Sequence, residues 1–364
     1  MRASVPAIAM SRVLSGTLHL LTPRGQSCDL LIEFVRKQMC VTAVSALGSA
    51  ISYVGCDVTD PGVVLLPGRR LADWVATLNG VCAFADAGER EVVIEGAGFE
   101  ARFITMRRDR PVPLERAPHL MTVDGRDLAR GVKRAMVAVA SDHNRPALSS
   151  ILLEREEDGL CLVGLDGRQM SVATLEATFE SDWPSCQVLV PAAQLGELAR
   201  EMSDVEEVGM GVAAAGNYLS VWTESVERSL LLTSGEFPEW RDAVPSDHGS
   251  VAVVRSQALG EALWRVSRLA DEEASVVHLQ LSASEIRMSS ETDELGSSRG
   301  AVPSELTGGE AGVRFGSRGL KTWLDAVGTE KVSVEVPSGR SRLALRCLPD
   351  DGSLYVSAGI ARSG

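Results

Sequence analysis

Three stretches of the chain share one pattern of hydrophobic positions. In 66–78, 190–202 and 315–327, four apolar residues follow the spacing i, i+3, i+4, i+7, which places them on one face of an α-helix. The residues are Leu71, Trp74, Val75 and Leu78, then Leu195, Leu198, Ala199 and Met202, then Leu320, Trp323, Leu324 and Val327. Each set begins 124 or 125 residues after the previous one (71 to 195, 195 to 320). The recurrence of this helical pattern at a nearly constant interval predicts a domain repeated three times along the chain.

A second amphipathic helix is predicted ahead of each of these, weakly over 11–21 and clearly over 124–140 and 255–270. In 124–140 the apolar stripe consists of Leu128, Val132, Ala135, Met136 and Val139. In 255–270 it consists of Leu259, Leu263, Val266 and Leu269. We expect each stripe to face a hydrophobic core.

Between and after the helices, apolar and polar residues alternate, as they do over 331–336. A period of two, broken by turn residues, is typical of antiparallel strands with one solvated face. Proline-bearing connectors at 108–118 and 237–245 separate the repeats. The sequence therefore predicts an α+β protein in which each domain packs two helices on antiparallel sheet. The expected domains are 1–115, 122–240 and 248–364.

The composition is that of a folded globular protein. Hydrophobic residues make up 45% and charged residues 23% of the 364 positions, which excludes a wholly disordered chain. No apolar run approaches the roughly 18 residues that cross a bilayer, and the first residues lack a secretory signal pattern. We therefore expect a cytoplasmic protein. Its seven cysteines are scattered without a CxxC pair, which favours reduced thiols over a disulfide or zinc framework.

The formal net charge of −13 argues against an evenly basic nucleic-acid-binding protein. Basic residues nevertheless gather on the predicted helices. In 124–140 they lie opposite the apolar stripe, and in 255–270 they lie roughly opposite it. Two interpretations stay open at this point. The residues form ordinary solvated helix faces, or they form a surface that binds phosphates without reading sequence and releases them as salt rises.

The sequence contains no recognisable catalytic constellation. The five histidines fall in unrelated segments without HxxxH or HExxH spacing, and neither a GxSxG elbow nor a P-loop occurs. The GxG within 95–101 lies between two strand patterns, as in a hairpin turn. The acid pairs Glu156–Glu157 and Asp350–Asp351 lie in predicted turns, where solvation is the default. We therefore expect a protein without catalysis, metal or cofactor.

Several segments together resemble a known family. RPALSSILLE at 145–154 is followed by GLCLVGLDGRQMSVAT at 159–174 and by GEFPEWRDAVP at 235–245. With PGVVLLPGRRLADWVATL at 61–78, their order is similar to that of the bacterial DNA sliding clamp, the beta subunit of DNA polymerase III. The likeness spans nearly the whole chain. It implies the DNA clamp fold and a head-to-tail homodimer, a ring of six similar domains with helices inside and sheets outside.

The resemblance implies a processivity factor that encircles double-stranded DNA and tethers the replicative polymerase, with no catalysis of its own. The phosphate contacts of such a ring would come from cations on the inner helices, which also reconciles DNA binding with an acidic total charge. The residues implied in this role are Arg69, Arg126, Arg130, Lys133, Arg134, Arg265 and Arg268, together with Arg24 in a loop near the family's DNA-contacting loop.

The resemblance also implies a hydrophobic cleft between the second and third domains, where the polymerase III alpha subunit, the clamp loader and repair proteins dock short peptides. The matching positions are Leu148, Leu165, Gly167, Arg168, Met170, Pro238, Asp242, Ala243, Gly316, Gly319, Val356, Ala358 and Ile360. Several depart from the family pattern. Leu165 replaces a threonine and Asp242 a basic residue, and Gly316 and Gly319 replace a polar and an aromatic residue. The start of the first domain is also expected to be shortened.

Three hypotheses stay open. The first is a working but divergent sliding clamp. The second is a specialised clamp paralogue whose altered cleft resists an inhibitor or serves an alternative polymerase. The third is an unrelated enzyme of repeated α+β domains, which would need a bound metal or nucleotide.

Overall fold

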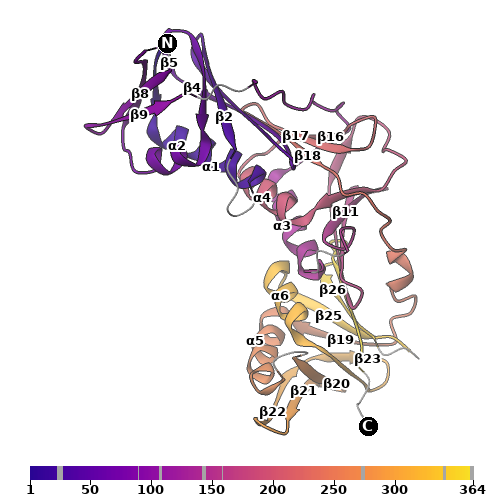
Figure 1. Ribbon diagram of the computed structural model, residues 1–364. Helices are drawn as coiled ribbons and strands as arrows, with labels where there is room; N and C mark the ends of the chain where they lie inside the picture. Colours follow the sequence, from indigo (N-terminus) through magenta and orange to yellow (C-terminus); the bar gives the residue numbers. More distant parts are fainter. Residues whose placement is uncertain are drawn as a thin grey trace. The chain divides into compact units, whose positions relative to one another are not determined.

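The computed structural model describes residues 1–22, 28–88, 90–105, 109–141, 145–157, 159–271, 275–338 and 342–360 (Figure 1). The chain divides into two compact units. The first unit contains Met1–Gly125, Thr178–Cys186 and Glu197–Leu232, and the second contains Arg126–Ala177, Gln187–Gly196 and Thr233–Gly364. The three predicted domain ranges stay a prediction, because the residues of the middle one are shared between the two units.

The first unit is built on two antiparallel sheets. The larger has the strand order β14 (Ala177–Phe179), β10 (Met121–Val123), β16 (Val208–Val212), β17 (Tyr218–Trp222), β18 (Val226–Leu231), β4 (Gly48–Gly55), β3 (Gln38–Ser45), β2 (Asp29–Val35), β6 (Gly62–Pro67). The smaller has the order β5 (Asp57–Asp60), β1 (Arg2–Pro6), β7 (Val81–Asp86), β8 (Glu91–Gly96), β9 (Phe99–Ile104). Helices α1 (Ala7–Leu21) and α2 (Gly68–Val75) pack side by side (Figure 1).

The second unit repeats this plan. Its larger sheet has the order β15 (Val188–Pro191), β11 (Ser150–Glu156), β12 (Gly159–Leu165), β13 (Gln169–Leu175), β27 (Leu354–Ala358), β26 (Arg342–Leu348), β25 (Lys331–Val336), β19 (Ser250–Arg255), β23 (Glu305–Thr307). Its smaller sheet has the order β22 (Gly296–Pro303), β21 (Glu285–Thr292), β20 (Val276–Ser282), β24 (Ala311–Gly316). The helices are α3 (Gly125–Ala135), which enters this unit at Arg126, α5 (Ser256–Val266) and α6 (Ser317–Val327), while α4 (Ala192–Met202) is divided between the units at Glu197. Short 3₁₀ segments are η1 (Met136–Ala138), η2 (Trp240–Ala243) and η3 (Ser267–Leu269).

Each large sheet joins strands that are distant in sequence. In the first unit β18 pairs with β4, with Ser229 opposite Ser49. In the second unit β13 pairs with β27, with Met170 opposite Val356. Gly48 makes the first junction possible, because its φ is +142° and a β-carbon there would lie 1.9 Å from the carbonyl oxygen of Ser229. Only glycine tolerates both the backbone angle and this close approach.

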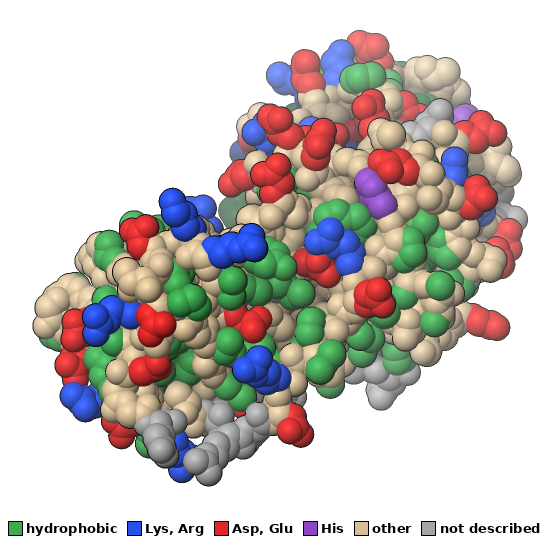
Figure 2. Space-filling model, turned by 90° about the horizontal axis from the view of Figure 1, so that it is seen from above, with side chains coloured by type: hydrophobic (Ala, Val, Ile, Leu, Met, Phe, Trp, Pro, Cys, Tyr) green, Lys and Arg blue, Asp and Glu red, His purple; other side chains and the backbone are tan. Residues whose placement is uncertain are grey.

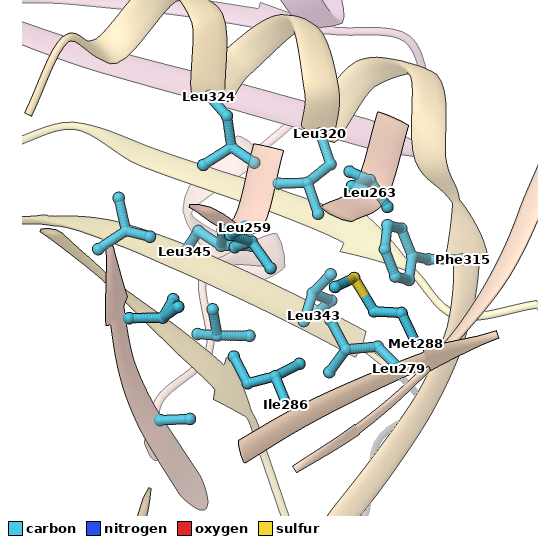
Figure 3. Close-up of a cluster of buried hydrophobic side chains, with 14 of the residues drawn as sticks. Leu259, Leu263, Leu279, Ile286, Met288, Phe315, Leu320, Leu324, Leu343 and Leu345 are labelled. Atoms are coloured by element: carbon cyan, nitrogen blue, oxygen red, sulfur yellow. The ribbon is translucent and has the colours of Figure 1, made fainter. Parts of the chain in front are cut away.

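The apolar stripes predicted for α5 and α6 form a core. Leu259 and Leu263 of α5 and Leu320 and Leu324 of α6 point toward strand residues that include Phe315 (Figure 3). The side chains of the other predicted helix faces are also buried, including all four apolar residues of α4 and Leu71, Val75 and Leu78 at α2. These helices were predicted correctly because a fixed spacing of apolar residues defines one buried face.

Two helix predictions were wrong in detail. The helix predicted over 124–140 ends at Ala135 and continues as the 3₁₀ segment η1. Because a 3₁₀ turn has three residues, it does not continue an α-helical stripe, and Met136 is 39% exposed. The helix predicted over 255–270 likewise ends at Val266, and Leu269 in η3 is half-buried.

The helix predicted weakly over 11–21 begins earlier than predicted. Residues 2–21 form the strand β1 and then the 15-residue helix α1. Pro6 takes the N-cap position of α1, where its missing N–H removes no helical hydrogen bond. The buried face of α1 begins at Ala7 and runs through Met10 and Leu14 to Leu21. Within the described residues no helix is long and apolar enough to cross a membrane.

Candidate functional site

Helix α3 carries exposed cations on one side. The side chains of Arg126, Arg130 and Lys133 are exposed, as the sequence predicts, while Leu128 and Val132 are buried on the opposite side. Arg130 forms an ion pair with Asp127 one turn earlier in the helix. No described residue gives Lys133 an ion pair, so its ammonium group is available to an anion in solution.

Arg134 corrects the sequence prediction. Its side chain is only 8% exposed, and its guanidinium group donates hydrogen bonds to the Asp351 carboxylate at 2.8 Å, to Ser353 Oγ at 2.6 Å and to the Val327 carbonyl at 2.6 Å. The helical wheel placed Arg134 beside Arg130 and Lys133, but α3 is packed on that flank as well. Arg134 therefore holds α3 to the end of α6 and is not part of an exposed basic face.

Helix α5 and the following η3 present Arg265 and Arg268, both exposed. Arg265 pairs with Glu261 at 3.1 Å, and the guanidinium group of Arg268 lies 4.2 Å from the ring centroid of Trp264. Trp264 is itself half-exposed, and the predicted apolar stripe does not include it. A cation stacked on an aromatic ring keeps its charge while its geometry is restrained.

The other predicted cations are in the first unit. Arg69 and its neighbour Arg70 are exposed at the start of α2. Arg24 lies outside the described residues. On the face shown in Figure 2, Lys and Arg side chains are interspersed with acidic and uncharged ones.

Several predicted cleft residues meet in one apolar cluster of the second unit. Leu148, Met170 and Val356 are buried in it, and Leu165 and Ala243 are partly buried against it. The cluster also contains two aromatic residues, Phe237 and Trp240, that the sequence analysis did not select. Their position in the connector GEFPEWRDAVP was the available signal. Pro238 and Asp242 in the same connector are exposed, and the connector contacts the cluster through Phe237, Trp240 and Ala243.

Hydrogen bonds hold this connector against the sheet. Trp240 Nε1 donates to Glu154 Oε2 at 3.0 Å, and Arg241 forms ion pairs with Glu154 at 2.9 Å and with Glu156 at 3.0 Å. The Arg241 guanidinium group also lies 4.3 Å from the ring centroid of Trp240. Arg342 Nη1 donates to the Ala243 carbonyl at 3.0 Å. One wall of the cluster is thus fixed by η2.

The two predicted glycines on the other side have different surroundings. Gly316 is half-buried at the N-cap of α6. Gly319 is buried, and a β-carbon there would lie 1.6 Å from Gln169 Oε1 and 2.7 Å from the Tyr355 hydroxyl oxygen. Tyr355 in turn donates a hydrogen bond of 2.7 Å to Gln169 Oε1. Gln169 and Tyr355 therefore occupy the space that a side chain at position 319 would need.

The remaining cleft residues lie along β13 and the end of the chain. Gly167, with φ +91°, and Arg168 are exposed in a turn that is closed by hydrogen bonds to the Asp166 carboxylate. The amide of Ala358 donates to the Arg168 carbonyl at 2.8 Å. Ala358 is exposed and Ile360 is half-buried, with its amide bonded to the Arg314 carbonyl at 2.7 Å. Within the described residues no group of three His, Cys, Asp or Glu side chains could hold a metal ion.

Comparisons with known proteins decide the family. The family model of the central domain of the DNA polymerase III beta subunit matches residues 122–239, and that of its C-terminal domain matches 241–360. The chain belongs to this family. The predictions of a sliding-clamp relative and of the α+β clamp fold are therefore confirmed.

Similar proteins agree with this assignment. The beta sliding clamp of Pseudomonas putida is 24% identical over 300 residues, which cover 82% of this chain and 81% of that protein. The beta sliding clamp homolog GriR of Streptomyces muensis is 26% identical over 221 residues, which cover 60% and 59%. A crystal structure of the Pseudomonas aeruginosa sliding clamp bound to griselimycin superimposes with a TM-score of 0.90 at 23% identity, covering 99% of each chain. The clamp fold thus extends over the first domain as well.

Proposed function

We propose that this chain is a DNA sliding clamp, a processivity factor that encircles duplex DNA and tethers a replicative polymerase without catalysis of its own. The observation that carries the proposal is the match to the beta-subunit family over both the central and the C-terminal domain. Exposed cations on α2, α3 and α5 support it, because a ring needs only sequence-independent contacts with phosphates. The cation set is Arg69, Arg126, Arg130, Lys133, Arg265 and Arg268, without Arg134.

The ring would close through free strand edges. Within the described residues, β9 ends the smaller sheet of the first unit and β22 ends that of the second, each with one unpaired edge. Next to these edges lie large exposed apolar side chains: Phe99 at 69%, Ile104 at 65% and Leu295 at 55%. An exposed apolar edge strand is a template for pairing with another chain. Pairing of β9 from one copy with β22 from a second would give a head-to-tail homodimer.

The proposed partners follow from this role. They are double-stranded DNA, a second copy of the chain, and the polymerase III alpha subunit and clamp loader at the apolar cluster around Met170 and Val356. The role requires no metal or cofactor, and it places the protein in the cytoplasm with the replicating DNA.

A charge reversal tests the DNA surface. Changing Arg126, Arg130 and Lys133 together to Glu should weaken equilibrium binding to a linear duplex at low salt while the unfolding transition stays in place, because all three side chains are exposed. The matched control reverses three exposed cations on strands, Arg155 on β11, Arg287 on β21 and Lys331 on β25. Binding of the triple variant to linear duplex at the level of the unchanged protein would show that α3 does not face DNA.

A second candidate function is that of a specialised clamp paralogue with an altered peptide cleft. It is favoured by the packing at Gly319, where Gln169 and Tyr355 fill the place of a side chain, and by the relative named as a beta sliding clamp homolog. On this hypothesis, the clamp-binding peptide of the host polymerase should bind this protein much more weakly than it binds the host's main clamp. Equal affinity in a calorimetric titration would exclude the paralogue.

A further inference from the structure

Four helices carry the same kind of surface ion pair. On α3, α4, α5 and α6, a cation pairs with a carboxylate three or four residues away on the same helix. The pairs are Asp127 with Arg130, Glu197 with Arg200, Glu261 with Arg265 and Asp325 with Lys321. Arg200 Nη2 lies 2.6 Å from Glu197 Oε1 and Arg265 Nη2 lies 3.1 Å from Glu261 Oε2. Each of these cations is therefore already next to an anion.

Helix stability alone does not account for this arrangement. Exposed pairs of this type contribute little to stability. In α6 the order is reversed, because Lys321 precedes Asp325, and this order runs against the helix dipole. What the four pairs share is their effect on surface charge: each cancels a cation on a helix that the proposed ring would turn toward DNA.

We propose that these four carboxylates act as internal counterions that compete with DNA phosphates for the helix cations. The inference rests on the proposed clamp function and deepens it. A phosphate that approaches Arg200 or Arg265 must displace the paired carboxylate, so each contact is weak. Because the protein already neutralises these cations, fewer solution ions are released on binding. The ring then holds DNA mainly by encircling it, and its contacts break easily as it slides.

Isosteric amides test the proposal without removing side-chain volume. In the variant Glu197→Gln/Glu261→Gln, the two arginines lose their competing anions and keep their charge. We expect equilibrium binding at low salt to tighten about twofold for each released pair that meets a phosphate, and so by up to about sixteenfold for the four pairs of the homodimer. The plot of log affinity against log salt should also become steeper, by up to about 0.9 for each added phosphate contact. The readout is fluorescence anisotropy of a labelled linear duplex, with the full-length dimer, over a salt series.

The chain offers a close control for the electrostatic effect. Glu285 on β21 pairs with Arg287 at 2.6 Å, the distance of the Glu197–Arg200 pair, and the carboxylate side chains are 34% and 35% exposed. Glu305, on β23, is also exposed. The variant Glu285→Gln/Glu305→Gln therefore changes the net charge by the same amount, but on strands.

The outcomes separate the proposal from its alternatives. Tighter binding of the helix variant with an unchanged strand control supports internal counterions. Equal tightening in both variants would show an effect of net charge and overturn the proposal, as would no change in either. Retention of the unchanged protein on circular but not linear DNA tests the clamp function separately. If it is retained and the helix variant binds DNA as the unchanged protein does, only the counterion proposal fails; if it is not retained, both fail.

Discussion

Replacing Arg134 by alanine would show how much one buried cation stabilises the second unit. Its guanidinium group bonds Asp351, Ser353 and the carbonyl of Val327, and it therefore links α3 to the last turn of α6 and to the turn before β27. The Ser171 hydroxyl also donates to the carbonyl of Arg134 at 2.7 Å. The variant would remove the side-chain bonds and leave this backbone contact.

The expected loss of stability depends on the charge that remains unpaired after the substitution. Removing one partner of a buried ion pair costs about 3–5 kcal/mol. The Asp351 side chain is 36% exposed, so water replaces part of the lost interaction, and we expect a loss of about 2–3 kcal/mol in the free energy of unfolding. Burial alone would raise the pKa of Asp351, but the hydrogen bond from Ser353 and the charge of Arg134 lower it overall. This contribution to stability is present above the ordinary pKa of an aspartate and is lost as the pH falls through the lowered value.

Urea unfolding followed by tryptophan fluorescence measures the effect, since Trp240, Trp264 and Trp323 are all in the second unit. Arg130→Ala is the matched control: the same substitution one turn earlier, at an exposed side chain, should cost less than about 0.5 kcal/mol. A loss for Arg134→Ala no larger than that of Arg130→Ala would refute the reasoning. So would an Asp351→Asn variant whose stability falls with acid as steeply as that of the unchanged protein.

Three further predictions concern packing and thiol chemistry. Gly319→Ala should cost about 1–3 kcal/mol in unfolding free energy by overpacking, and adding Gln169→Ala should recover most of that loss; a Gly319→Ala protein as stable as the original would show that Gln169 moves freely. Arg228→Met should lower the free energy of unfolding by about 3–5 kcal/mol, because this fully buried side chain pairs with Glu201 and donates a hydrogen bond to the Ile51 carbonyl. A loss below about 1 kcal/mol in chemical denaturation would contradict this argument. Burial raises the pKa of the Cys28 thiol to about 11. Iodoacetamide at about pH 8 should therefore modify the exposed Cys186 before Cys28. Peptide mass spectrometry measures the two modification rates, and equal rates would contradict this order.

The sequence predicted best what depends on local periodicity. The buried faces of α4, α5 and α6 follow from the spacing of Leu195, Leu259 and Leu320 and their neighbours, because a helix turns regularly and its apolar stripe needs a core. Helical periodicity gave the wrong environment for Arg134, because it assumes that a helix has a single packed side. Helix α3 is packed on a second side as well, where Arg134 bonds Asp351 and the Val327 carbonyl.

Pairings between distant segments could not be predicted from the sequence. Nothing local indicates that β18 pairs with β4 or that β13 pairs with β27, since a strand pattern defines a face but not a neighbour. The same limit applies to the cleft. The resemblance identified Met170 and Val356, and they do meet, but the cause of the glycine at position 319 became visible only when Gln169 and Tyr355 were in place.

Loading onto nicked circular DNA by the host clamp loader, with retention compared before and after linearisation, tests the central claim most directly. A closed ring is held by topology and needs no tight contact with phosphates. The account therefore predicts that the protein stays on circular DNA through gel filtration at moderate salt and is lost once the DNA is cut, because the ring slides off the ends. Equal retention on circular and linear DNA would show binding without encirclement. The absence of retained protein on circular DNA after incubation with the clamp loader would contradict the clamp function.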